Sequence, residues 1–157
     1  MAKQLTYKER HPDYTEPAEV EYLNLIMKKS NALDIVSGDK KVEYRAYNTH
    51  YCKRLIDDRV SAYMKMHAKD KDINEVSALR PVYALHFHDY NNSWYLDIEC
   101  VNNGIVSVDD EGVKFMHDNF GCHELDAENE RLNAIGEKKR PLYFFFSLGE
   151  VIATNVQ

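Results

Sequence analysis

Charged side chains at alternating positions of one short segment form the first candidate site. In a strand over residues 41–46, Glu43 and Arg45 are two positions apart and share one face. Lys40 precedes them and follows Gly38, a residue type that suits the left-handed end of a helix. Arginine binds phosphates and base edges, carboxylates act as general bases or accept from cytosine N4, and lysine contacts phosphates or serves as a base. The alternative is a solvated lysine beside an ion pair worth well under ~1 kcal/mol.

Three further candidates stand in two later strand-like segments. His86 and His88 share one face of residues 82–88, a spacing that can chelate a metal or supply acid and base for RNA cleavage. Most such pairs are ordinary surface histidines, so we predict no metal site. Glu99, on the outward face of residues 94–101, is a candidate second carboxylate if that face meets the cleft, and otherwise a solvated strand residue.

Aromatic residues are frequent, with eleven Tyr and six Phe. Most are expected in the core, above all the run at 143–146, but some can stack on bases for ~1–3 kcal/mol each. Tyr47 follows the strand that carries Arg45, so we select it as the stacking residue.

Several classes of site are not indicated. The three cysteines are scattered without a C-x-x-C pair, which disfavours structural zinc and a disulfide framework. No phosphate-binding loop, dinucleotide-binding glycine pattern or nucleophile elbow is present, so no cofactor is predicted. No apolar segment approaches the ~20 residues of a membrane span, and we expect a cytoplasmic protein without a membrane partner.

Charge is divided unevenly along the chain. The net charge is −6, which argues against a wholly basic nucleic-acid footprint. Residues 28–71 hold eleven Lys/Arg and six Asp/Glu, whereas residues 85–137 hold twelve Asp/Glu and two Lys/Arg. This division fits local anion binding in the first stretch, and it also fits a basic protein partner for the acidic second half. Ordinary solvated faces fit it as well.

Periodicity and turn residues predict one α+β domain over residues 20–157, preceded by a flexible or surface-hugging arm over residues 1–19. Strands are expected at 20–27, 41–46, 82–88, 94–101 and 142–147, the last with an extension through 151–152. Helices are expected at 31–37, 48–72, 109–118 and 124–135, and a turn at 102–104.

Three segments in this order resemble the ASCH family of the PUA-like superfamily. They are IVSGDKKVEYR at 35–45, VYALHFH at 82–88 with WYLDIEC at 94–100, and YFFFSLGEVI at 143–152. The segment YCKRL at 51–55 is also similar to a subgroup with a helix after the second strand. The resemblance implies a PUA-like small β-barrel of about five to six strands with peripheral helices and a cleft beside the Gly-x-Lys-x-x-Glu-x-Arg element.

In that family the cleft is thought to take RNA or a modified nucleoside, and a few relatives are ribonucleases or amidohydrolases on acetylated cytidine. The resemblance therefore implies binding of single-stranded RNA or a nucleotide beside Gly38, Lys40, Glu43 and Arg45. To this predicted ligand-binding set we add Tyr47, His86 and His88 on the grounds given above. A hydrolase using Lys40, Glu43 and Glu99 is the alternative. The amidohydrolases carry Thr where this chain has Glu43, which weakens that alternative. A protein-interaction module remains a third hypothesis, and the sequence leaves the oligomeric state open.

Overall fold

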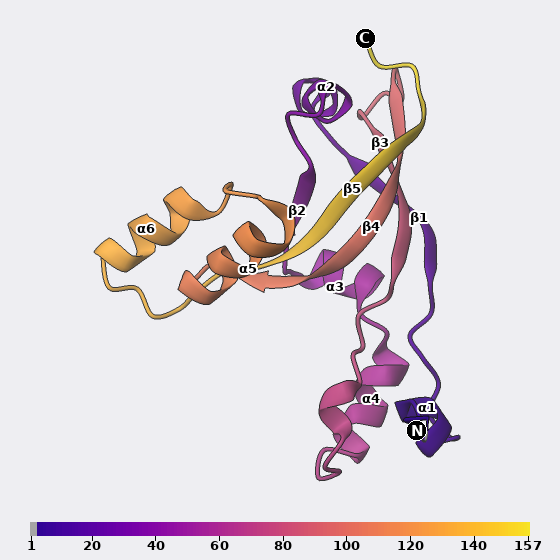
Figure 1. The fold of residues 1–157 in the computed structure, drawn as a ribbon. Helices are drawn as coiled ribbons and strands as arrows, with labels where there is room; N and C mark the ends of the chain where they lie inside the picture. Colours follow the sequence, from indigo (N-terminus) through magenta and orange to yellow (C-terminus); the bar gives the residue numbers. More distant parts are fainter. Residues whose placement is uncertain (1–2) are drawn as a thin grey trace. The chain divides into compact units, whose positions relative to one another are not determined.

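The computed structural model of the chain describes residues 3–157, which form two compact units. One unit comprises residues 20–48 and 82–157 and contains the β-sheet; the other comprises residues 3–19 and 49–81 and is helical (Figure 1). The described residues contain six α-helices, one 3-10 helix and five strands, which confirms the α+β prediction. None of the helices in residues 3–157 is both long and apolar enough to span a membrane.

The sheet is five-stranded and mixed, with strand order β1-β3-β4-β5-β2. Edge strand β1 pairs in parallel with β3, and every other pair is antiparallel. Among the described strands no ladder joins β1 to β2, so the sheet is open and the predicted closure into a barrel is not established. The strands are β1 (Val20–Ile26), β2 (Val42–Ala46), β3 (Val82–His88), β4 (Tyr95–Ser107) and β5 (Leu142–Thr154).

Strand β5 is buried on both faces near its start. Phe144, Phe145 and Phe146 are all buried, as expected for a central strand with a continuous apolar run. Phe145 belongs to a core cluster to which α5 and α6 contribute Met116 and Leu132. The remaining buried members of this cluster are Val42, Val106, Val108 and Leu125.

Three helices flank the sheet within this unit. Helix α2 (Lys29–Ser37) connects β1 to β2 and buries Ala32 and Ile35. Helix α5 (Asp110–Phe120) is capped by Asp109, whose carboxylate accepts from the Gly112 N–H at 2.7 Å. Helix α6 (Asp126–Ala134) follows after a short link.

The predicted turn at residues 102–104 is wrong, because β4 runs through it to Ser107. Asn102, Asn103 and Gly104 pair with residues of β5, and register shifts just before them absorb the irregularity. At Gly104 a Cβ atom would lie 2.6 Å from the Phe145 ring. The glycine therefore admits an aromatic ring from the neighbouring strand instead of making a turn.

The helical unit contains α1 (Tyr7–Arg10), α3 (Thr49–Leu55), α4 (Asp58–Met66) and η1 (Ile73–Glu75). The single helix predicted over residues 48–72 is thus divided, since Asp57 caps a new helix by accepting from the Arg59 N–H at 3.1 Å. Of the predicted arm, the first two residues lie outside the described residues. Residues 3–19 contain a capped helix and place Tyr7 and Tyr14 in a buried cluster with Val60 and Val76.

Candidate functional site

The end of α2 and the start of β2 position the Gly-x-Lys-x-x-Glu-x-Arg element. Gly38 ends α2 in the left-handed conformation (φ 89°), and its N–H donates to the Ile35 carbonyl. The Lys40 N–H then donates to the Asp34 carbonyl at 3.0 Å, which holds the lysine just ahead of β2. Glu43 lies opposite Phe146 in the β2–β5 ladder, so its face of the strand is fixed by the register.

Lys40, Glu43 and Arg45 form one row of ion pairs, which we call the β2 charge row. Nη2 of Arg45 lies 3.1 Å from Oε2 of Glu43, and Nζ of Lys40 lies 3.7 Å from Oε1 of the same carboxylate. The side chains of Lys40, Glu43 and Arg45 are only 15%, 10% and 16% exposed. A largely buried carboxylate therefore lies between two cations, so removing one partner is expected to cost more than it does in a solvated surface pair.

Each end of the β2 charge row contacts another part of the unit. Nη2 of Arg45 donates to the carbonyl of Ile26, at the end of the opposite edge strand β1, at 2.9 Å. Nζ of Lys40 lies 3.2 Å from Oε2 of Glu124, which precedes α6 and is 45% exposed. Arg45 therefore connects the two edge strands of the open sheet, and Lys40 connects β2 to the link before α6.

Two clefts adjoin these end contacts. The larger, of about 880 Å³, includes Ile26, Lys28, Lys29 and Trp94 in its wall; the rest of its lining is Met27, Asp89, Tyr90, Ser93, Asn155 and Gln157. The smaller, of about 390 Å³, is lined by Gly38, Asp39, Lys41, Val42, Phe120, Gly121, Cys122, His123 and Glu124. Arg45 thus bonds to a wall residue of the larger cleft and Lys40 to one of the smaller.

Two tyrosines stand on either side of Arg45 in the sequence. Tyr47 stacks on Phe144 with ring centroids 5.1 Å apart and is 43% exposed, so an aromatic surface remains accessible beside β2. The hydroxyl of Tyr44 lies 3.0 Å from Sγ of Cys122. Burial, and then this hydrogen bond, raises the pKa of Tyr44 above its usual value, so the phenol is neutral.

The other predicted site residues belong to β3 and β4. Nδ1 of His86 is hydrogen-bonded to the Asp97 carboxylate, and Nδ1 of His88 lies 2.8 Å from the Asp89 carbonyl oxygen. Glu99 is exposed on β4 and lies against Gly149. The structure therefore brings Lys40, Glu43 and Arg45 together. His86 and His88 lie on β3 with other hydrogen-bond partners, and Glu99 lies on the middle strand β4.

Several partners of the site were not predicted from the sequence. Glu124 pairs with Lys40 across 84 positions, and no periodicity indicates such a contact.

A separate cluster, also not predicted from the sequence, brings together His117, His123 and Asp126. Only the spacing of these residues, within ten positions, hints at it. The hydrogen bond with His117, and then that with His123, lowers the pKa of Asp126.

A scan against protein-family models found no match for the chain, and searches of curated proteins and of solved structures found none either. The ASCH resemblance rests on the sequence motifs alone and stays a prediction.

Proposed function

We propose that the sheet-containing unit is an ASCH-type, PUA-like domain that binds single-stranded RNA or a nucleotide beside the β2 charge row. The observation that carries the proposal is the burial of Glu43 between Lys40 and Arg45, the three charged residues of the motif. Contact of Arg45 with the opposite edge strand is what a sheet curled toward a barrel requires, and so supports the fold assignment.

The contacts of the row indicate how a ligand is held. Glu124 is the more exposed of the two carboxylates at Lys40, so a phosphate can replace it there at little desolvation cost. Glu43 is held in place by Arg45 and can accept a hydrogen bond from an exocyclic amine. The exposed part of Tyr47 supplies a stacking surface for a base.

Hydrolysis at the same row is the second candidate. Lys40 and Glu43 place an amine and a carboxylate side by side, which are residue types that general acid–base catalysis uses, and this favours the alternative. At 3.7 Å the two groups form an ion pair and not a hydrogen bond. Glu43 occupies the position of the threonine found in the related amidohydrolases, so the row lacks that hydroxyl. Binding without turnover is therefore the function we put first.

A gel series with end-labelled single-stranded RNA at low salt distinguishes these functions. Native protein is expected to shift the RNA. Lys40→Ala is expected to abolish or strongly weaken the shift, because it removes the cation with which an RNA phosphate would pair in place of Glu124. Lys139→Ala is the matched control, since Lys139 is an exposed lysine of the same unit. Equal shifts by the native protein and Lys40→Ala contradict the site assignment.

The same gel separates binding from turnover. Shortened fragments that disappear with Lys40→Ala establish a ribonuclease. RNA that is neither shifted nor cut by native protein contradicts the RNA proposal. Two hypotheses then remain: a small nucleoside as the ligand, or a basic protein partner that binds the acidic residues of α5 and α6.

A further inference from the structure

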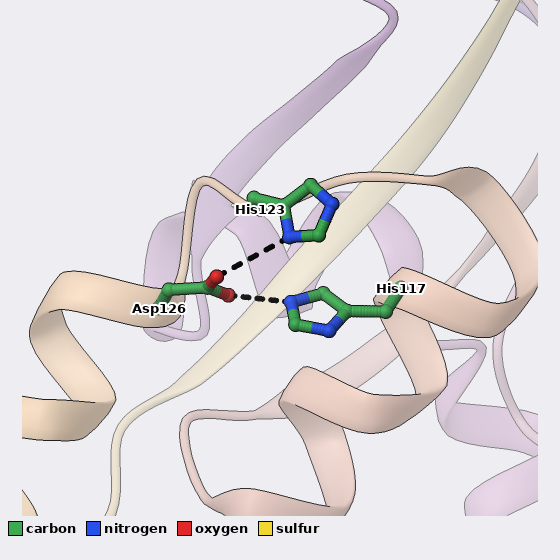
Figure 2. Close-up of side chains that lie close together, drawn as sticks. All are labelled: His117, His123 and Asp126. Atoms are coloured by element: carbon green, nitrogen blue, oxygen red, sulfur yellow. Dashed lines mark hydrogen bonds and ion pairs between the residues drawn. The ribbon is translucent and has the colours of Figure 1, made fainter.

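Two histidines and one aspartate meet where α5 is followed by α6. His117 lies in the last turn of α5, Asp126 is the first residue of α6, and His123 lies in the link between them (Figure 2). Nε2 of His117 is 2.6 Å from Oδ1 of Asp126, and Nδ1 of His123 is 3.3 Å from Oδ2. One donor atom of each residue lies within 4.8 Å of the other two, so the three donors are close enough to share one ion.

The backbone of the link brings the two histidines together. Gly121 is left-handed (φ 59°) and its N–H donates to the His117 carbonyl at 3.0 Å, while the Cys122 N–H donates to the Met116 carbonyl at 3.2 Å. This pair of bonds ends α5 and reverses the chain. As a result the rings of His117 and His123 lie 4.1 Å apart between centroids. The Asp126 N–H donates to the His123 carbonyl at 3.2 Å and fixes the third donor.

Buried residues next to the donors anchor this arrangement in the core, while the donor side chains stay accessible to solvent. Met116 and Leu125 each neighbour a donor residue in the sequence, and both are buried in the cluster shared with the sheet. The side chain of His123, by contrast, is 66% exposed. An ion can therefore reach the three donors from solvent without unfolding either helix.

We propose that His117, His123 and Asp126 form a binding site for a divalent transition-metal ion, with zinc as the fitting ion. Two imidazole nitrogens and a carboxylate are ligands that zinc binds well, whereas magnesium and calcium prefer all-oxygen sites. A tetrahedral zinc ion with bonds of about 2.0–2.2 Å holds its ligand atoms roughly 3.3 Å apart. The separations here bracket that value, so side-chain rotations suffice to bring the donors onto an ion.

The donor set also predicts the coordination of the ion. Three protein donors leave one tetrahedral position, which water occupies in such sites. Sγ of the neighbouring Cys122 lies 3.0 Å from the Tyr44 hydroxyl and is not among the three clustered donors, so the predicted ligands are nitrogen and oxygen only. The ion connects the end of α5 to the start of α6. This proposal does not rest on RNA binding; the same link carries Glu124, which pairs with Lys40.

Cobalt(II) titration of untagged, chelator-treated protein tests the site directly. The expected result is visible absorption that saturates at one equivalent, without a thiolate charge-transfer band, and is abolished by added zinc. Zinc is also expected to raise Tm, because an ion bound only by the folded state stabilises it. His123→Asn is expected to weaken cobalt binding by more than about tenfold and to remove the zinc shift.

The control is His67→Asn, which removes a His–Asp pair of similar geometry that lies outside the cluster. Nδ1 of His67 is 2.9 Å from Oδ2 of Asp70. This variant is expected to bind cobalt like the native protein. Absence of saturable cobalt absorption, or equal binding by His123→Asn and native protein, overturns the proposal. Because His123 is exposed, circular dichroism of the metal-free His123→Asn variant is expected to match the native protein, so lost binding reports lost ligation.

Discussion

Replacing Glu43 with glutamine is expected to destabilise the sheet-containing unit, because it leaves two cations without the carboxylate between them. Arg45 and Lys40 lie 3.1 and 3.7 Å from that carboxylate. Removing one partner of a fully buried pair costs about 3–5 kcal/mol, whereas an exposed pair contributes about 0–1 kcal/mol. With side chains 10–16% exposed, we expect an intermediate loss of about 2 kcal/mol.

Urea denaturation followed by tryptophan fluorescence measures this loss. Trp94 is the single tryptophan of the chain and is buried in the same unit, so its emission reports unfolding of that unit. A loss of about 2 kcal/mol also lowers Tm by roughly 4–8 °C in a chain of this size. Glu21→Gln is the matched control, since Glu21 is exposed on edge strand β1, and it is expected to change stability by less than about 0.5 kcal/mol.

A double-mutant cycle tests whether the loss comes from the ion pair itself. Glu43→Gln combined with Arg45→Met is expected to be less destabilising than the sum of the single changes by about 0.5–3 kcal/mol, because the two residues share one interaction. Strict additivity, or a Glu43→Gln protein as stable as Glu21→Gln, would refute the view that the β2 charge row is a buried network.

Three further predictions follow from individual contacts. Glu124→Gln is expected to tighten RNA binding about two- to fivefold in fluorescence anisotropy, because it frees Lys40 from an exposed competitor worth under ~1 kcal/mol. Burial raises the pKa of Cys100 to about 12, so thiol labelling at mildly alkaline pH is expected to spare Cys100 until urea unfolds the protein, as read by peptide mass spectrometry. The Ala18 N–H and then Arg59 lower the pKa of Asp57, so Asp57→Ala is expected to cost about 1–2 kcal/mol at neutral pH. That difference from native is expected to shrink as the pH falls from about 4, the usual range of an aspartate, through the lower pKa of the native carboxylate. Thermal melts followed by circular dichroism measure it, and a difference between Asp57→Ala and native protein that does not change with pH contradicts the prediction.

Local periodicity was sufficient to predict the parts of the fold that depend on a few adjacent residues. The strand at 82–88 has the predicted bounds, and Glu43 and Arg45 share a strand face because side chains alternate. Asn102 to Gly104 looked like a turn because these residue types favour one. The pairing of β4 with β5, which is a long-range property, overrides that preference.

The candidate site was predictable only to the extent that it is local. Lys40, Glu43 and Arg45 lie within six residues, whereas Glu124 and the Ile26 carbonyl reach them through tertiary folding. The packing of Tyr7 and Tyr14 with residues of α4 and the following loop depends likewise on distant side chains, and the polar composition of the first nineteen residues gives no sign of it.

The most direct test of RNA binding at the β2 charge row is the salt dependence of affinity for fluorescein-labelled single-stranded RNA. Each phosphate neutralised on a single strand contributes about 0.7 to the slope of log Kd against log salt concentration. Lys40→Gln is predicted to weaken binding and to reduce this slope by about that amount, while Lys139→Gln leaves both close to native. Native affinity and slope in Lys40→Gln would contradict the proposed site.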